Sequence, residues 1–210
     1  MNLTKQKIMK YYDITIPLSE NTANWPGAEK YKRVETKTSA ITSTITLRSH
    51  YATHIDAPKH FVFEKSSVDK IKPELLIGKY KVFEVFSKSI IEIEDIQKFG
   101  ISAGDRILFK TSNSKINLKP DFTENYVSLG LSVAKYLVQK RILLVGIDYF
   151  GIEAKSSPGH PVHKTLLSKN IVIVEGLNLK AVLPGTYQGA ILPIKIEGGD
   201  GAPARAVLWK

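Results

Sequence analysis

Two unbroken apolar runs constrain the fold of this chain more than any other feature. Residues 142–147 read ILLVGI and residues 171–174 read IVIV. A strand with apolar side chains on both faces must be covered on both faces, as in sheets flanked by helices. Residues 131–140 and 163–169 have the spacing of helices that could supply this cover, and Asn170 can end the second one. The sequence therefore predicts a layered protein built around a sheet.

Several other segments have the character of strands. They are residues 11–16, 40–48, 81–86, 106–110 and 189–209, the last broken by the glycine-rich residues 198–201. In the segment 40–48, apolar Ile41, Ile45 and Leu47 alternate with polar residues, which predicts a half-buried strand.

Two shorter signals complete the expected organisation. Residues 25–27 (Trp-Pro-Gly) predict a turn, and residues 93–99 predict a short helix with Gly100 at its C-cap. Many strands and few helices favour an α/β or α+β architecture with a substantial sheet. The sequence contains no repeat, low-complexity tract or linker, so we expect residues 1–210 to form a single domain.

The composition is that of a globular protein in a reducing compartment. Hydrophobic residues make up 43% and charged residues 24%, and there is no cysteine, which excludes disulfides and thiolate metal sites. No apolar run approaches the roughly 20 residues that a membrane span needs. The N-terminal segment MNLTKQKIMKYY lacks the apolar core of a signal peptide. We therefore expect a cytoplasmic protein with no membrane partner.

The net charge of +10 raises the alternative of a nucleic-acid partner. The lysines are scattered, however, and the densest groups are short (Lys30, Lys32 and Arg33; Lys140 and Arg141). No basic stripe interleaves with aromatic residues, and no nucleic-acid-binding motif is present. A solvated, lysine-rich surface is the favoured interpretation, so we expect no nucleic-acid partner.

A histidine cluster lies in the segment SHYATHIDAPKHF, which holds three of the five histidines in the chain. Pro58 excludes a regular helix here, so the segment is expected to be extended, with His50, His54 and Asp56 on one face. Ala52 leaves room between the first two. In a fully extended chain, positions 50 and 54 lie about 13 Å apart. Two imidazoles could barely share an ion across that gap, so the chain must curve.

Two neutral imidazoles and one carboxylate are suitable ligands for a divalent ion, with zinc the best fit and manganese or iron as alternatives. Three protein ligands leave a position for water, as in catalytic sites. His60 follows Pro58 and is either a fourth ligand or, in the favoured interpretation, an acid or base for proton transfer. The alternative for the whole cluster is a run of surface histidines.

The other two histidines, His160 and His163, lie in the segment SSPGHPVHKTLL. Glu175 ends the apolar strand that follows, where a carboxylate is costly unless it is paired or bound to metal. No histidine lies outside the two clusters. His163 and Glu175 are therefore a candidate second ligand pair, and a bridging Asp56 would allow two ions about 3.5–4 Å apart.

The first cluster closely resembles the H-x-G-T-H-x-D-x-P-x-H signature of the cyclase family, which includes bacterial kynurenine formamidase (arylformamidase) and isatin hydrolase. Five further segments resemble this family in the same order and extend the resemblance over nearly the whole chain. They are DITIPLSENTANWPG, GDRILFKTSNS, LLVGID, HKTLL with IVIVEGLNL, and GGDGAPARAVL.

This resemblance implies a swivelling β/β/α domain with a mixed sheet and few helices, and a homodimer or larger homo-oligomer. It implies Zn²⁺, with Mn²⁺ possible, as one or two ions per chain. One ion would be held by His50, His54 and Asp56, and a second, where that site is occupied, by Asp56, His163 and Glu175. His60 matches the catalytic histidine of the family, and Trp25 of the W-P-G segment is a candidate substrate-binding residue.

The implied reaction is hydrolysis of a small amide, arylformamidase-like, by metal-activated water with His60 as general acid and base. Departures from the family pattern leave the substrate open: Ala52 replaces a glycine, Ala28 an aspartate, and Gly151 and Glu153 a serine and an aspartate. The alternatives are hydrolysis of an isatin-like lactam, a lactone or an ester. A metal-binding protein that has lost catalysis is a further alternative, against which the intact His60 argues.

Overall fold

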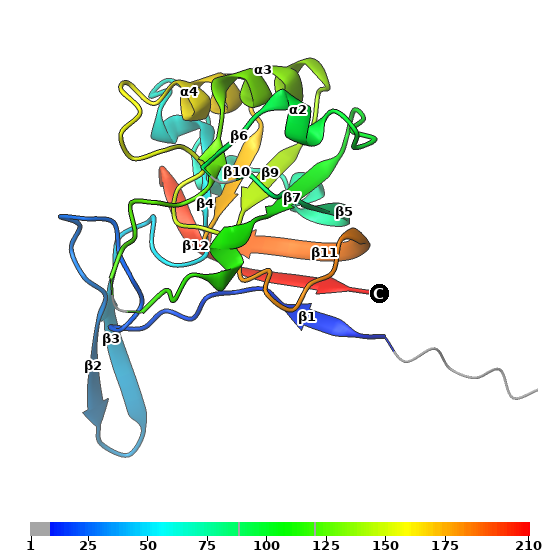
Figure 1. The fold of residues 1–210 in the computed structure, drawn as a ribbon. Helices are drawn as coiled ribbons and strands as arrows, with labels where there is room; N and C mark the ends of the chain where they lie inside the picture. Colours follow the sequence, from blue (N-terminus) through cyan, green and yellow to red (C-terminus); the bar gives the residue numbers. More distant parts are fainter. Residues whose placement is uncertain (1–8, 88, 120) are drawn as a thin grey trace, which may run out of the picture.

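The body of the molecule is an eight-stranded mixed sheet, seen in a computed structural model that describes residues 9–87, 89–119 and 121–210 (Figure 1). Of the N-terminal segment MNLTKQKIMKYY, which was predicted not to be a signal peptide, residues 1–8 lie outside the described residues. In sheet order the strands are β1 (Tyr11–Asp13), β12 (Gly201–Trp209), β11 (Gly185–Pro193), β5 (Ile77–Glu84), β7 (Arg106–Lys110), β9 (Leu144–Ile147), β10 (Val172–Glu175) and β4 (His54–Asp56).

The sheet curls until its two sides meet. Strands β5, β7, β9 and β10 are parallel, whereas β1, β4, β11 and β12 pair in antiparallel fashion. Strand β4 pairs with β10 on one side and also with the beginning of β12 on the other. The result is a barrel-like sheet in which a three-residue strand forms the seam.

The two apolar runs form neighbouring strands of this sheet and are buried, as predicted. Strands β9 and β10 lie parallel and every residue in them is buried. Helices α2 (Ile93–Ile96), α3 (Leu131–Gln139) and α4 (Pro161–Leu167) lie together on one side of the sheet (Figure 1). Apolar side chains from β5, β7, β11 and β12 fill the other side. The predicted mixed sheet with few helices is confirmed.

Several predicted boundaries shift. Helix α4 begins at Pro161, and Asn170 ends the segment with a left-handed φ of 58°, as expected. Helix α2 ends at Ile96, so the prediction of Gly100 as its C-cap is wrong. The chain leaves the helix early because Phe99 turns back to stack on Phe83, with ring centroids 4.3 Å apart.

Two predicted strands also differ in extent. Strand β5 covers Ile77–Glu84 rather than residues 81–86, because its pairing with β11 extends back to Ile77, while Phe86 lies beyond the strand and is exposed. Strand β1 ends at Asp13, after which only an isolated bridge joins Thr15 to Leu177.

The segment 40–48 contains a strand, but the prediction that it is half-buried is wrong. Strands β2 (Lys32–Lys37) and β3 (Ile41–Thr46) form a two-stranded hairpin that projects from the body (Figure 1). Every residue of both strands is exposed. The alternation of Ile41 and Ile45 gives one apolar face, but within the described residues no second layer covers it.

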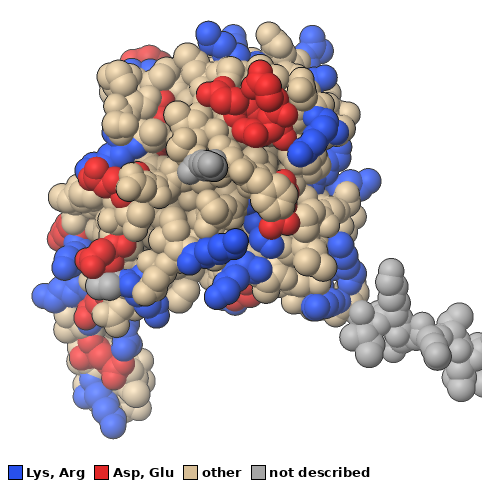
Figure 2. Space-filling model, in the orientation of Figure 1, with Lys and Arg blue, Asp and Glu red and all other residues tan. Residues whose placement is uncertain are grey.

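The remaining elements are short. They are η1 (Pro58–His60), η2 (Val68–Lys70), α1 (Pro73–Leu76), β6 (Ile90–Ile91), η3 (Ser112–Lys115) and β8 (Ser128–Leu129). On the face in Figure 2, Lys and Arg side chains are spread among acidic ones rather than gathered in one stripe. Among the described residues, none of the helices has the length and apolarity to cross a bilayer.

Candidate metal centre

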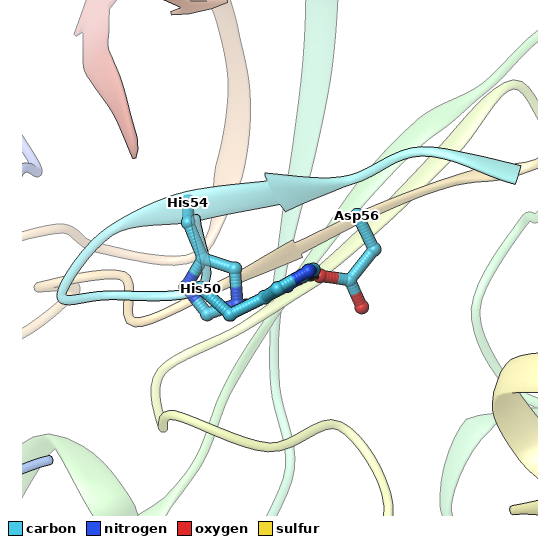
Figure 3. A group of neighbouring side chains, drawn as sticks. All are labelled: His50, His54 and Asp56. Atoms are coloured by element: carbon cyan, nitrogen blue, oxygen red, sulfur yellow. Dashed lines mark hydrogen bonds and ion pairs between the residues drawn. The ribbon is translucent and has the colours of Figure 1, made fainter. Parts of the chain in front are cut away.

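The first cluster is built on a strand and on the bend that precedes it. His54 and Asp56 lie two residues apart on β4 and are buried (Figure 3). The prediction that the strand also includes His50 is wrong, because β4 begins only at His54. The predicted curvature is confirmed: Ala52 has a left-handed φ of 55°, and the turn brings His50 Nδ1 to 2.7 Å from Asp56 Oδ1.

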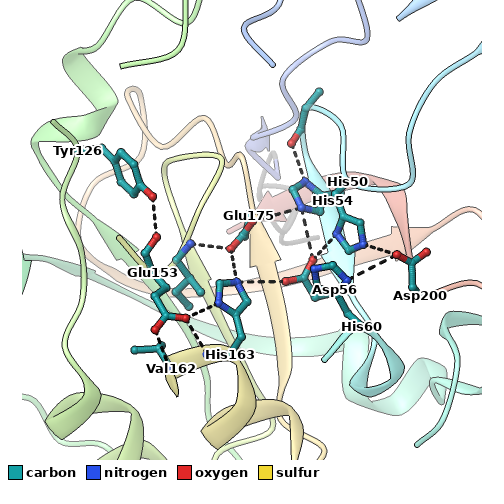
Figure 4. A network of polar contacts seen from close by, with 12 residues as sticks. His50, His54, Asp56, His60, Tyr126, Glu153, Val162, His163, Glu175 and Asp200 are labelled. Atoms are coloured by element: carbon teal, nitrogen blue, oxygen red, sulfur yellow. Dashed lines mark hydrogen bonds and ion pairs between the residues drawn. The ribbon is translucent and has the colours of Figure 1, made fainter. Parts of the chain in front are cut away.

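The second cluster lies beside the first because β10 pairs with β4. Glu175 is directly opposite His54 in this pairing, and their Oε2 and Nε2 atoms lie 3.3 Å apart. His163, from α4, places its Nε2 3.2 Å from Glu175 Oε1 and 3.7 Å from Asp56 Oδ2. The two oxygens of Asp56 therefore face different histidines, and the structure brings all five predicted ligand residues together (Figure 4).

In each of the three candidate ligand histidines, the ring nitrogen that points away from the centre donates a hydrogen bond. His163 Nδ1 donates to Glu153 Oε2 at 2.7 Å, His50 Nε2 to Asp200 Oδ2 at 2.9 Å, and His54 Nδ1 to the Ala52 carbonyl at 3.0 Å. Ligand histidines are commonly oriented in this way by carboxylates and backbone carbonyls. This orientation leaves His163 Nε2, His50 Nδ1 and His54 Nε2 facing one centre (Figure 4).

These residues fit a divalent ion. Among the described residues, His54 Nε2 and Asp56 Oδ2 are buried without a hydrogen-bond partner, although Glu175 Oε2 lies 3.3 Å from the first and His163 Nε2 3.7 Å from the second. Donor atoms of His50, His54 and Asp56 lie within 4.8 Å of one another, as do those of Asp56, His163 and Glu175. Imidazoles combined with carboxylates suit zinc and its neighbours in the first transition row.

The negative charges of the buried carboxylates also favour binding of a cation. Burial lowers the pKa of His54, but Asp56 and Glu175 outweigh it and raise that pKa to about 10. Burial likewise lowers the pKa of His163, and Glu153 and Glu175 raise it to about 10. Burial raises the pKa of Asp56, yet the neighbouring histidines bring it well below its usual range. Without a metal, protons on the histidines balance the buried carboxylates.

His60 faces the same centre from η1. Pro58 begins this short turn of helix, and the ring of His60 stacks on that of His50 with centroids 3.8 Å apart. Its Nδ1 lies 3.5 Å from Asp200 Oδ2. His60 is partly exposed and lines the pocket above the cluster.

Asp200 and Glu153 both orient candidate ligands, a role that was not predicted from the sequence. Glu153 is buried and also accepts hydrogen bonds from Ser157 Oγ and the Val162 amide. The available signal for Asp200 was its place in the GGDG segment, whose last residue, Gly201, begins β12 beside β4. Gly201 allows this approach, because a Cβ there would lie 2.6 Å from His50 Cε1 and from the Ile55 carbonyl oxygen.

A pocket of about 330 Å³ opens above the cluster. Trp25, Phe61 and Phe150 give it aromatic walls, and His160, whose role the sequence left open, also lines it. Trp25 packs edge-on against Phe122 at 5.0 Å. The absence of a side chain at Gly151 makes room, since a Cβ there would lie 3.1 Å from the Trp25 ring.

Comparison with known proteins shows the family of this chain. The model of a family described as "Putative cyclase" matches residues 12–154. The chain belongs to the cyclase family. A kynurenine formamidase of Salinibacter ruber (strain DSM 13855 / M31) is 32% identical over 207 residues, covering 95% of this chain and 97% of that protein.

Solved structures share the fold over nearly the whole chain. One described as a potential metal-dependent hydrolase with cyclase activity is 38% identical, with a TM-score of 0.88, and covers 96% of this chain and 98% of its own. An isatin hydrolase bound to the product analogue thioisatinate has a TM-score of 0.84 and covers 96% of this chain and 92% of its own. At 20% identity, the second likeness concerns the fold alone.

Proposed function

We propose that the protein is a metal-dependent hydrolase that cleaves the C–N bond of a small amide, in the manner of an arylformamidase. The observation that carries this proposal is the pair of ligand sets sharing Asp56 at the floor of an aromatic-walled pocket. The similarity to a kynurenine formamidase and to a metal-dependent hydrolase supports it. The substrate would be an N-formyl aromatic amine, and the products formate and the free amine.

His50, His54 and Asp56 would hold one ion, and Asp56, His163 and Glu175 a second. Zinc suits these ligands best, and manganese is the alternative. When bound, a divalent ion supplies a Lewis acid that favours deprotonation of water near neutral pH and polarises a carbonyl. Asp200, Glu153 and the Ala52 carbonyl hold the histidine rings in the orientation that this binding needs.

The pocket walls would bind and orient the substrate. Trp25, Phe61 and Phe150 offer apolar surface to an aromatic ring and exclude water from the scissile amide. The volume of about 330 Å³ is at the lower end for small-molecule sites and suits a single-ring substrate.

His60 would carry the proton. Its Nδ1 faces Asp200, so its Nε2 is the atom that would accept a proton from the attacking water and deliver it to the departing amine nitrogen. Stacking on His50 fixes the plane of the ring beside the ligand set. A proton carrier can be distinguished from a fourth ligand by substitution. If His60 carries the proton, replacing it lowers the rate and leaves metal binding intact.

The test is hydrolysis of N-formylkynurenine, isatin and simple lactones by zinc- and manganese-loaded protein. We expect formate release from the formamide, loss of turnover with a chelator, and a fall in kcat of about 10²–10⁴-fold in His60→Ala with metal content unchanged. Full activity in His60→Ala, or turnover of isatin or lactones in place of the formamide, would contradict the proposal.

We also propose that residues 1–210 act as one domain and that the protein is a homodimer or larger homo-oligomer. The exposed isoleucines of the β2–β3 hairpin, Ile41 and Ile45, support an association of this kind. The absence of cysteine supports a cytoplasmic location.

A further inference from the structure

We propose that Arg48 forms a carboxylate-binding subsite at the mouth of the pocket, so that the preferred substrates are aromatic amides that carry a carboxylate. This inference rests on the proposed amide hydrolysis and names the substrate class of the same site. It depends on the position of Arg48, on its lack of an ion-pair partner and on the charges around it.

The chain holds Arg48 at the pocket from both sides. Leu47 packs against the buried cluster that contains Tyr31 and Tyr51, and His50 belongs to the metal centre. Arg48 lines the same pocket as His50 and His54 but is exposed, whereas His54 is buried. Arg48 is therefore at the open side of the pocket, and the ligand sets lie at its floor.

Arg48 takes part in none of the ion pairs among the described residues. Asn24, another polar residue of the lining, is engaged, because its side-chain amide donates to the Ala28 and Glu29 carbonyls. An arginine free of internal partners beside a ligand-sized pocket can present its planar fork of donors to a carboxylate.

Within the part of the chain that the structure describes, no acidic side chain of the pocket mouth is available to bind an ammonium group. The acidic residues of the described lining are Glu153 and Glu175, and both are buried and hydrogen-bonded to His163. Pro26 and Ala28 line the pocket without charge. The mouth therefore favours an anionic substituent, while the aromatic walls bind the ring and the floor receives the amide.

Four compounds test the subsite: 3- and 4-formamidobenzoate, and the two corresponding formamidobenzamides, which keep the shape but lack the charge. We expect the wild-type protein to favour the benzoates in kcat/KM. Arg48→Met should reduce this preference about tenfold, mainly through KM, because a charge-assisted hydrogen bond is lost. Arg48→Lys should keep part of the preference, because its charge remains.

Arg141→Met is the matched control, because it removes an exposed positive charge that lies outside the pocket lining. It should leave the preference unchanged. An equal preference in the wild type and in Arg48→Met would overturn the inference. Because a bound metal would itself attract a carboxylate, the change caused by the substitution is decisive rather than the wild-type preference.

Binding of the product analogues separates this inference from the proposed reaction. We expect 4-aminobenzoate to bind the wild-type protein about tenfold more tightly than 4-aminobenzamide, and Arg48→Met to lose most of this difference, by calorimetry. If no formamide is hydrolysed but this difference is found, the subsite stands and the reaction fails. If formamides are hydrolysed and Arg48→Met changes neither preference, the reaction stands and the subsite fails.

Discussion

Ala52 lies between the two histidines of the first cluster in a conformation that suits glycine. Its φ of 55° is left-handed, which costs a residue with a Cβ about 1–2 kcal/mol. Its carbonyl nevertheless holds the His54 ring and closely approaches Gly176, where a Cβ would lie 2.1 Å from that oxygen. The turn is therefore needed for the centre, although the residue at its apex is strained.

Ala52→Gly should raise the free energy of unfolding by about 0.5–1 kcal/mol, because it relieves the left-handed strain and only partly loses this gain to the entropy of the unfolded chain. Denaturant unfolding of the metal-free protein measures it. Ala57→Gly is the control, since Ala57 has a φ of −80° and the same change there should destabilise the protein. Equal destabilisation by both would show that Ala52 is not strained.

Glu153 acts on the centre through His163. Glu153→Gln should weaken metal binding by about 10–100-fold. The carboxylate accepts hydrogen bonds from His163 Nδ1, Ser157 and Val162 with its two oxygens. An amide has only one oxygen, so its NH₂ group would have to face at least one of these donors. Metal titration with a competing chelator measures it. Glu124→Gln, which removes an exposed partner of Lys155, should leave the affinity unchanged; a comparable loss there would refute the role of Glu153.

At the scale of elements, β4 is the strand that joins the two halves of the site. Glu175 of β10 lies opposite His54, and Gly201 of β12 lies opposite Asp56. Three residues of β4 thus contact two strands that follow it by more than a hundred positions. Because β4 and β12 pack closely, a larger side chain at the start of β12 would collide with His50.

Gly201→Ala should displace the His50 ring, because the added Cβ would meet it at 2.6 Å. We expect destabilisation of about 1–3 kcal/mol and weaker metal binding. Thermal unfolding and metal titration measure the two effects. Gly100→Ala is the control, since a Cβ there meets nothing within 4 Å. Unchanged metal affinity in Gly201→Ala would contradict this account.

The sequence predicted the elements that depend on local pattern. The buried runs of β9 and β10, the helix before Asn170 and the bend in the first histidine cluster follow from hydrophobicity, capping and the reach of a side chain. The pairing of His163 with Glu175 followed from the cost of burying a carboxylate. These features need no knowledge of distant strands.

Features that depend on distant strands were not predictable in the same way. Asp200 reaches His50 because β12 pairs with β4, and the local pattern GGDG does not predict that pairing. The alternation of Ile41 and Ile45 defines a shared face, but pattern alone does not say whether another layer covers it. The helix before Gly100 ends early because of the contact of Phe99 with Phe83.

At the scale of the whole molecule, metal binding should stabilise the fold. At a metal concentration a thousandfold above Kd, the gain of about 4 kcal/mol should raise Tm by roughly 8–16 °C. Thermal unfolding before and after chelation measures the shift. An unchanged Tm, with metal binding shown by titration, would mean that the unfolded chain binds the ion as tightly as the folded chain does.

This stabilisation should depend on pH. In the metal-free protein the pKa of His54 and of His163 is raised to about 10. Their protonated forms therefore contribute their full stabilisation below the unfolded-state pKa of about 6.5. This stabilisation is lost as the pH rises through about 10. Metal binding needs the same nitrogens without protons. The difference in Tm between the loaded and metal-free protein should therefore widen from pH 6 to pH 9.

Two controls accompany the pH series. Metal binding at pH 7 should release protons, seen as a dependence of the calorimetric heat on the buffer. His163→Gln should flatten the pH dependence of the metal-free protein, because one of the two protonated groups is absent. A difference in Tm that stays constant with pH would contradict the expected protonation of these histidines.

The hairpin offers a test of self-association. Ile41 and Ile45 lie on one face of β3, and Thr42 and Thr44 lie on the other. Replacing both isoleucines with lysine should lower the molar mass measured by light scattering to that of a single chain. Replacing both threonines with lysine should have a smaller effect. An unchanged mass in the isoleucine variant would exclude this face as the contact.

The seam formed by β4 also has a consequence for biosynthesis. His50, His54 and Asp56 leave the ribosome early, but their partners Glu175 and Asp200 are synthesised more than a hundred residues later. A nascent chain therefore carries half of a chelating centre, next to an unpaired strand, for most of its translation. Because long-range pairing of this kind is slow to form, a chaperone that shields this segment would protect it both from aggregation and from premature capture of the wrong metal.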